Sequence, residues 1–232
     1  MEIIPAIMPQ DVSDLRNKLA LIRGQVNAVQ LDLMDGVFVR GKTWPYNGKQ
    51  EEFFNQIMHE EEGLPFWDEF DFELDLMVKD ASGQLDTFML LGAKRLVFHI
   101  EAEDTTENKF QEFLEGIDLY IRDNVEIGVA INNDTPLENI FPLIHCIDFV
   151  QCMGIARIGI QGEPFDERVL ERIKILHEKY EELPISVDGS INLETIHLLM
   201  EAGATRFVVG SAIWKNNEPE LALAELQSLV IQ

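Results

Sequence analysis

Segments typical of strands and of helices alternate along the whole chain, and this alternation constrains the fold more than any other feature. Apolar runs predict eight strands, at residues 2–8, 29–39, 72–78, 95–100, 126–131, 148–153, 185–188 and 207–210. Helical spacing and capping signals predict a helix after each strand, at residues 11–23, 49–61, 81–91, 107–122, 136–143, 166–180, 193–202 and 218–230. Alternating units of this kind predict a parallel sheet. Eight of them in 232 residues, with no linker between them, predict one α/β domain over residues 1–232, a closed (β/α)8 TIM barrel.

Charge and composition exclude several classes of partner. The net charge of −24 argues against nucleic acid, because a nucleic-acid-binding face needs clustered lysine and arginine. An anionic ligand would have to be held by local backbone amides, since the overall field repels it. There is no apolar stretch of the roughly 18 residues that a membrane helix needs, no secretory signal, and no disulfide framework in Cys146 and Cys152. We expect a cytoplasmic protein with reduced cysteines and no membrane partner.

Three acids occupy comparable places near strand ends: Asp32 in the second strand, Asp75 in the third and Asp188 at the end of the seventh. A single strand-end aspartate is more often a helix cap than a catalyst. In a TIM barrel, however, the carboxyl ends of all strands meet at one mouth, where active sites lie. Like charges brought close together cannot all stay ionised unaided. Either a cation joins them or one carboxyl holds a proton, and both outcomes suit acid–base chemistry.

Two further sets of residues are candidates for substrate binding at the same mouth. Loops after the seventh and eighth strands of TIM barrels often hold phosphate through backbone N–H groups. The candidates in those loops are Gly189, Ser190, Gly210 and Ser211, and Gly159 and Gly162 after the sixth strand add further amides. Met34, Met77 and Met153 lie near strand ends, where they either line the substrate site or fill the core.

Histidines and lysines offer little further chemistry. His99 ends the fourth strand, and a strand histidine is usually a hydrogen-bonded core residue, with ligand contact as the alternative. The sequence contains no HExxH motif and no lysine within a strand that would form a Schiff base.

The sequence resembles the ribulose-phosphate 3-epimerase family over almost the whole chain. Its most specific segment is Asp-Leu-Met-Asp-Gly-Val-Phe-Val at residues 32–39. The other segments that carry the resemblance are 4–8, 74–78, 98–102, 128–132, 187–189 and 210–213. The resemblance implies an isomerase that interconverts ribulose 5-phosphate and xylulose 5-phosphate, or a related ketose phosphate, by proton transfer at C3. It also implies that Asp32 and Asp188 are the acid–base pair and that the chain forms a homo-oligomer, a dimer or larger.

The chain departs from the family pattern at the metal site. The family holds a divalent metal with two aspartates and two histidines, whereas Gln30 and Asp75 stand where this pattern has histidine. An all-oxygen shell of Gln30, Asp32, Asp75 and Asp188 would favour Mg²⁺, Mn²⁺ or Ca²⁺ over Zn²⁺ and preserve epimerisation. In the alternative, the chain uses no metal, and the barrel binds a sugar phosphate without epimerising it or catalyses different chemistry. Related decarboxylases and synthases have a lysine between acids, but this chain has Leu76 there, and Lys79 falls beyond the strand end.

Overall fold

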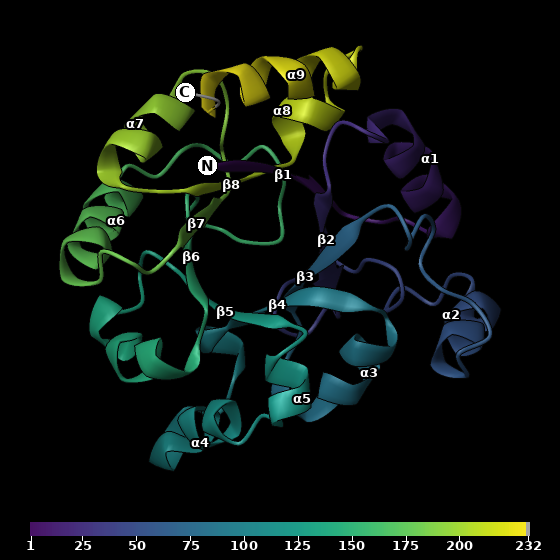
Figure 1. Ribbon diagram of the computed structural model, residues 1–232, viewed down its shortest axis with the longest axis horizontal. Coiled ribbons are helices and arrows are strands. Elements are labelled where there is room, and N and C mark those ends of the chain that lie inside the picture. Colours follow the sequence, from purple (N-terminus) through teal and green to yellow (C-terminus); the bar gives the residue numbers. More distant parts are fainter. Residues whose placement is uncertain (231–232) are drawn as a thin grey trace.

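Eight parallel strands close into a barrel in chain order in the computed structural model, which describes residues 1–230 (Figure 1). The strands are β1 (Glu2–Ile7), β2 (Ala28–Met34), β3 (Asp71–Met77), β4 (Ala93–His99), β5 (Glu126–Ile131), β6 (Phe149–Met153), β7 (Ile185–Asp188) and β8 (Arg206–Val209). β8 pairs with β1, which completes the ring and leaves no sheet edge unpaired. The predicted (β/α)8 barrel is therefore confirmed.

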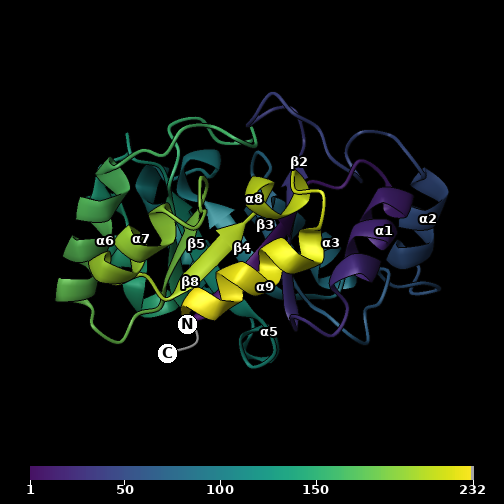
Figure 2. The same ribbon diagram turned by 90° about the horizontal axis from the view of Figure 1, so that it is seen from above.

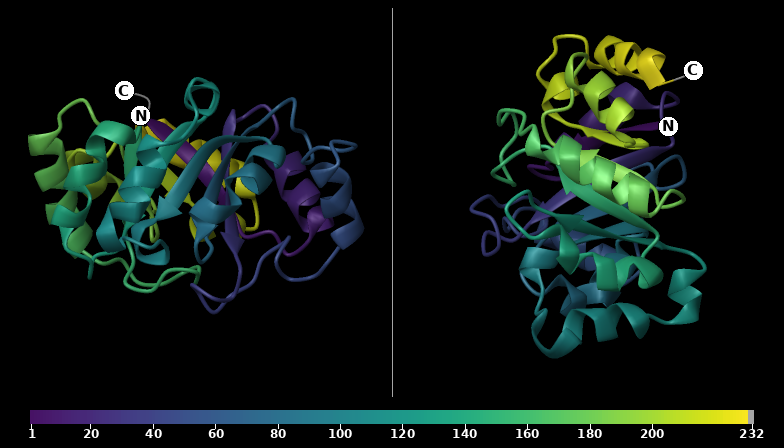
Figure 3. Two further views of the ribbon diagram at one scale, coloured as in Figure 1. Left: turned by 90° about the horizontal axis from the view of Figure 1, so that it is seen from below. Right: turned by 90° about the vertical axis from the view of Figure 1, so that its left-hand side faces the viewer.

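Helices surround the barrel on the outside (Figures 1 and 3). They are α1 (Val12–Ile22), α2 (Glu51–Met58), α3 (Leu85–Leu90), α4 (Lys109–Glu115), α5 (Leu119–Arg122), α6 (Arg168–Lys179), α7 (Thr195–Ala202), α8 (Ser211–Trp214) and α9 (Pro219–Val230). Within residues 1–230, none of these helices has both the length and the apolarity that crossing a membrane requires. Cys146 and Cys152 are both buried and form no disulfide with each other.

Helix α1 shows how the sequence specifies these units. The Asp11 side chain accepts a hydrogen bond from the Asp14 backbone N–H at 2.9 Å, which satisfies a donor that the first helical turn leaves free. The four apolar residues at helical spacing, Val12, Leu15, Leu19 and Ile22, are all buried. One polar cap and one apolar stripe thus determine where α1 starts and which face it turns to the barrel.

Three predicted helices and one predicted strand differ from the structure. The helix predicted over 81–91 begins as a 3₁₀ turn, Ala81–Gln84, before α3, and the strand predicted over 29–39 ends at Met34. The predicted helix over 107–122 is divided into α4 and α5, because Gly116 ends the first and Asp118 caps the second through the Tyr120 N–H at 2.8 Å. The segment predicted as a helix over 136–143 consists of two 3₁₀ turns, Leu137–Asn139 and Phe141–Cys146, since Pro142 has no N–H with which to continue an α-helix. The short helix α8, directly after β8, was not predicted.

The interior of the barrel is charged at the end where the strands begin. Glu73 on β3 and Arg206 on β8 form a buried ion pair, and the Arg206 guanidinium carbon lies 4.1 Å from the centre of the Phe149 ring. Burial raises the pKa of Glu73, and the charge of Arg206 opposes that rise. The pair thus lies near the amino ends of β3 and β8, away from the end where the strands finish.

The opposite end carries the long connections. Figure 2 shows the loops after β2 and after β6 at the end of the barrel away from the N-terminus. Because all strands are parallel, their carboxyl ends meet at this rim. The register pairs Asp32 with Asp75 and Met153 with Asp188, so residues far apart in sequence reach the same depth.

Candidate active site

The three predicted aspartates converge inside the barrel mouth. Successive residues of a strand point to opposite faces, so Gln30 and Asp32 share the inner face of β2. Asp75 on β3 and Asp188 on β7 join them, and one carboxylate oxygen of each aspartate lies within 4.8 Å of the others. Asp75 is fully buried and Asp32 is 4% exposed. Three carboxylates at this distance, two of them buried and the third partly buried, need protons or a cation.

The electrostatics of the cluster favour protonated acids. Burial raises the pKa of Asp188 to about 7, and the charge of Asp75 adds to that rise. Burial also raises the pKa of Asp32 well above its ordinary value, with further contributions from Asp188 and then Asp75. A carboxyl group with a pKa near neutrality can both take and give a proton at physiological pH.

Gln30 joins two aspartates that come from β2 and β7, strands that are not neighbours in the barrel. Its Nε2 donates to Asp32 Oδ1 at 2.9 Å and to Asp188 Oδ2 at 3.1 Å. Both hydrogen bonds lower the pKa of the carboxyl that accepts them, against the larger effect of burial. The amide is buried, and its Oε1 has no hydrogen-bond partner within residues 1–230.

These residues fit a divalent cation. Oε1 of Gln30 and Oδ2 of Asp75 are buried oxygens without a partner in the described part of the chain, and such oxygens are costly unless something binds them. Rotating the Gln30 amide by half a turn would exchange its oxygen and nitrogen and present Oε1 to the carboxylates. The candidate donors Gln30, Asp32, Asp75 and Asp188 are then all oxygen atoms, the type that hard cations prefer.

A pocket opens above the cluster toward solvent. Of the residues predicted to bind substrate, those that line it are Met77, Met153, Gly159, Gly162, Gly189, Ser190, Gly210 and Ser211. Asp32 and Asp188 lie at the same pocket, whereas Gln30 and Asp75 are buried and do not line it. Met34 does not line it either, and it packs in a small apolar cluster with Val39 and Met77. The pocket thus combines carboxyl groups, thioether walls and glycine-bearing loops.

The glycine-bearing side of the pocket is closely approached by two polar side chains that the sequence did not single out. A Cβ on Gly162 would lie 2.5 Å from the ammonium nitrogen of Lys215, and a Cβ on Gly210 would lie 2.8 Å from Nε2 of Gln161. Glycine is therefore needed at both positions for these side chains to lie where they do. Ser190 directs its hydroxyl to the carbonyl oxygen of Glu163, which ties the loops after β6 and β7 together.

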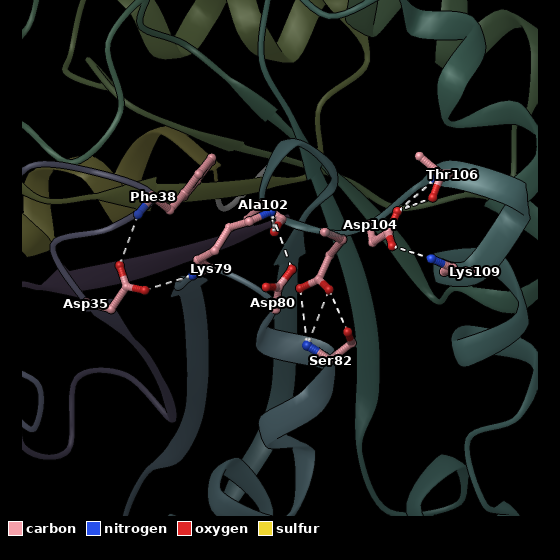
Figure 4. A network of polar contacts seen from close by, with 10 residues as sticks. Asp35, Phe38, Lys79, Asp80, Ser82, Ala102, Asp104, Thr106 and Lys109 are labelled. Atoms are coloured by element: carbon pink, nitrogen blue, oxygen red, sulfur yellow. Dashed lines mark hydrogen bonds and ion pairs between the residues drawn. The ribbon is translucent and has the colours of Figure 1, made fainter.

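A network of hydrogen bonds fixes the rim on the side of β2, β3 and β4 (Figure 4). Asp35 accepts from the backbone N–H of Val37 at 2.7 Å and of Phe38 at 3.1 Å, and its other oxygen accepts from the Lys79 N–H at 2.9 Å. The Lys79 ammonium donates to the Ala102 carbonyl oxygen at 2.8 Å. The loops after β2, β3 and β4 are thereby joined. Lys79 connects these loops and does not line the pocket.

His99 and Thr43 form hydrogen bonds to two residues of the cluster, Asp75 and Asp32. Nε2 of His99 lies 2.9 Å from Oδ1 of Asp75, and both side chains are fully buried. Burial lowers the pKa of His99, but the charge of Asp75, its hydrogen bond to the ring and the charges of Glu101 and Asp188 together outweigh burial, so the pKa lies above its ordinary value. The Thr43 hydroxyl donates to the Asp32 carbonyl oxygen at 2.7 Å and accepts from the Met34 N–H at 2.9 Å. The sequence predicted a hydrogen-bonded core histidine but not its partner, and it gave no signal for Thr43.

Comparison with known proteins agrees with this geometry. The model of the "Ribulose-phosphate 3 epimerase family" matches residues 2–214. A "Ribulose-phosphate 3-epimerase, cytoplasmic isoform" of Oryza sativa subsp. japonica is 27% identical over 232 residues, covering 99% of this chain and 94% of the relative. The "Ribulose-phosphate 3-epimerase" of Bacillus subtilis is 27% identical over 233 residues and covers 98% of each chain.

Solved structures share the fold at lower identity. The structure titled "KGPDC from Streptococcus mutans in complex with D-R5P" has a TM-score of 0.71 at 15% identity, covering 98% of this chain and 96% of that one. A 3-hexulose-6-phosphate synthase structure has a TM-score of 0.67 at 18% identity, covering 99% of this chain and 100% of that one. At these identities the likeness concerns the barrel alone. The family match over nearly all of the barrel, together with paired aspartates at its mouth, shows that the chain belongs to the ribulose-phosphate 3-epimerase family.

Proposed function

We propose that this protein interconverts ribulose 5-phosphate and xylulose 5-phosphate, or a related pair of ketose phosphates, by moving a proton at C3. The observation that carries the proposal is the pairing of Asp32 and Asp188. They come from β2 and β7, which are not neighbours in the barrel, are linked through one Gln30 amide nitrogen, and lie at one pocket. An epimerase of this kind needs two proton-transfer groups, one for each face of the reacting carbon.

The proton transfer divides between the two carboxyl groups. One aspartate begins ionised and takes the C3 proton, leaving an enediolate, while the other begins protonated and gives its proton to the opposite face. The configuration at C3 is inverted, and the two aspartates have exchanged their protonation states. The raised pKa of each carboxyl supports this division, because at neutral pH the pair can hold one proton between them.

The phosphate of the substrate is proposed to lie at the glycine-bearing side of the pocket, away from the acids. Backbone amides of the loops after β6, β7 and β8 would hold it, with the lining residues Gly162, Gly189, Gly210 and Ser211. Met77 and Met153 would contact the carbon chain, and they keep water from the enediolate. Met34 is proposed to act only by supporting Met77.

A divalent cation is proposed as the cofactor, held by Gln30, Asp32, Asp75 and Asp188. When bound, it would supply positive charge beside the enediolate oxygens. The all-oxygen donor set supports Mg²⁺, Mn²⁺ or Ca²⁺ over Zn²⁺. Replacing a neutral imidazole by a carboxylate at Asp75 also adds negative charge, which makes a cation more favourable there.

One experiment tests activity and metal together. The purified protein, stripped with a chelator, is given ribulose 5-phosphate in D₂O with each of several divalent ions, and NMR follows xylulose 5-phosphate and deuterium entering at C3. We expect turnover that needs a hard divalent ion and falls by at least about a thousandfold in Asp32→Asn and Asp188→Asn. Absence of both turnover and C3 exchange with every ion would contradict the proposal.

The second candidate function is sugar-phosphate binding without a metal and without epimerisation. The observation in its favour is that the carboxylates already have partners within the chain, Gln30 for Asp32 and Asp188, and His99 for Asp75. It predicts that ribulose 5-phosphate binds the chelator-treated protein as tightly as the metal-supplemented protein, and that no deuterium enters its C3 position.

A cytoplasmic location and assembly into a homodimer or larger oligomer also remain proposals. The family relation supports both, and one relative is named as a cytoplasmic isoform. In the aromatic connector between α2 and β3, Phe70 is buried whereas Trp67 is 69% exposed, which suits a subunit contact. Light scattering coupled to gel filtration tests assembly, and a monomer at working concentration would contradict it.

A further inference from the structure

We infer that His99 is a positioning residue that acts on the proposed cation site through Asp75. The inference rests on the cation site proposed above. His99 ends β4 and Asp75 lies on the neighbouring strand β3, so the barrel itself brings the imidazole beside the carboxylate. Nε2 of His99 and Oδ1 of Asp75 are 2.9 Å apart, and both side chains are fully buried.

The hydrogen bond from His99 gives the two Asp75 oxygens different roles. His99 holds Oδ1, whereas Oδ2 has no partner within the described residues. The carboxylate also belongs to the group whose oxygens approach within 4.8 Å of one another. A carboxylate can rotate about its last side-chain bond, and a fixed donor on one oxygen removes that freedom. The geometry therefore leaves Oδ2 as the oxygen available to a cation.

The imidazole is itself held in place. The Phe38 ring lies 5.4 Å from the His99 ring, tilted by 50°, and Asp35 fixes the Phe38 backbone (Figure 4). Nδ1 of His99 is buried without a partner in residues 1–230, so the only hydrogen bond of the ring there goes to Asp75. The ring is packed from one side and hydrogen-bonded on the other, which gives Asp75 a rigid support.

Where the family pattern has a histidine on the third strand, this chain thus places a carboxylate on that strand and supports it with a histidine from the next. Aspartate is shorter than histidine and has two equivalent oxygens, so it requires more orientation to act as a single ligand. Removing a group that hydrogen-bonds to a metal ligand and orients it typically weakens metal binding by about 10–100-fold. His99 is assigned that role.

The experiment measures Mn²⁺ binding to the chelator-stripped protein without substrate, by the electron paramagnetic resonance signal of free Mn²⁺. His99→Leu removes the donor and keeps an apolar side chain of moderate size, while His99→Gln keeps an N–H donor. We expect Mn²⁺ to bind at least about tenfold more weakly to His99→Leu and within about threefold of wild type in His99→Gln. His145→Leu, at an exposed histidine paired with Glu115, is the matched control and is expected to bind as wild type does.

A double-mutant cycle with Asp75→Asn tests whether His99 acts through that carboxylate. If it does, adding His99→Leu to Asp75→Asn weakens Mn²⁺ binding no further. Independent losses in the two variants, wild-type affinity in His99→Leu, or no Mn²⁺ binding by the wild-type protein would each overturn the inference. Thermal unfolding of every variant identifies losses of Mn²⁺ binding that are due to misfolding. If His99→Leu is misfolded, the affinity of His99→Gln for Mn²⁺ decides the outcome. Wild-type protein that binds Mn²⁺ but does not turn over ribulose 5-phosphate would refute the proposed function and leave this inference standing.

Discussion

Gln30 and Asp188 are 158 positions apart in sequence, yet the amide nitrogen of one donates to Oδ2 of the other at 3.1 Å across the barrel. The same nitrogen donates to Asp32 at 2.9 Å. One neutral side chain therefore contacts both proposed acid–base groups. In the family pattern this position is a histidine, so the substitution replaces a metal-binding nitrogen by a group that bridges the two carboxyls.

The bridge makes a prediction about pH dependence. Gln30→Leu removes a hydrogen bond that lowers the pKa of Asp32 and of Asp188, so both pKa values should rise. In the chelator-treated protein, where the amide bridges the two carboxyl groups, their ionisation followed by ¹³C NMR should therefore move to higher pH in Gln30→Leu. Gln111→Leu, on helix α4, is the control. An unchanged titration of the two carboxyl groups in Gln30→Leu would show that the bridge does not lower their pKa values.

The cluster also predicts how stability changes with pH when no cation is present. The pKa of Asp188 is about 7 in the folded protein and 3.8 in the reference state, so the proton binds more tightly to the folded form. The stabilisation is complete below the lower value and is lost as pH rises through the upper one. The unfolding free energy in chelator should therefore fall by up to about 3 kcal/mol between about pH 5 and pH 8.

Urea unfolding at both pH values measures this loss. Asp188→Asn has no proton to lose there and should show a smaller decrease. Millimolar Mn²⁺ should restore wild-type stability at the higher pH, because it binds the ionised cluster. Equal stability of the wild-type protein at both pH values in chelator would rule out the electrostatic account of the cluster.

The barrel could be predicted from sequence because each strand and most helices carry a local signal. The apolar stripe of α1 and its Asp11 cap are examples, and both are in place in the structure. The predicted aspartates follow from the same reasoning, since parallel strands carry all their ends to one rim. Local signals failed where a helix is interrupted, as at Gly116 and Pro142, because propensity averaged over a window hides a single break.

Partnerships within the site could not be predicted in this way. The bond between His99 and Asp75 depends on how two strands are staggered, and the strand pattern gives each residue a face but no precise neighbour. Lys215 approaches Gly162 across 53 positions of sequence, for which no periodic signal exists. The packing of Met34 with Val39, a loop residue, likewise has no signal in the strand pattern.

The charged end of the barrel predicts a large effect on stability. Arg206→Met would leave the carboxylate of Glu73 fully buried without its cation, which typically costs about 3–5 kcal/mol. Urea unfolding should show that loss, and Glu73→Gln in the same chain should recover part of it. Arg23→Met, which breaks a surface pair with Glu69, should leave the unfolding free energy nearly unchanged. Similar effects of the two arginine variants would contradict a structural role for the buried pair.

Lys215 gives a prediction about substrate recognition. Its ammonium lies over Gly162 at the side of the pocket proposed for phosphate, and within residues 1–230 it makes no ion pair with an acid. In a chain of net charge −24, a cation at that point would offset the repulsion of a phosphate dianion. Lys215→Met should therefore raise KM for the sugar phosphate on the order of fivefold and leave kcat nearly unchanged, because the contact is the same in ground and transition states.

Steady-state kinetics at low and moderate salt measure this effect, and salt should reduce the difference between Lys215→Met and wild type by screening the charge. Lys215→Arg should keep KM near the wild-type value, since the cation remains. Lys94→Met, at the beginning of β4 and so at the other end of the barrel, is the matched control. A fall in kcat at unchanged KM would place Lys215 in the chemical step instead, and an unchanged KM and kcat would show that backbone amides alone hold the phosphate.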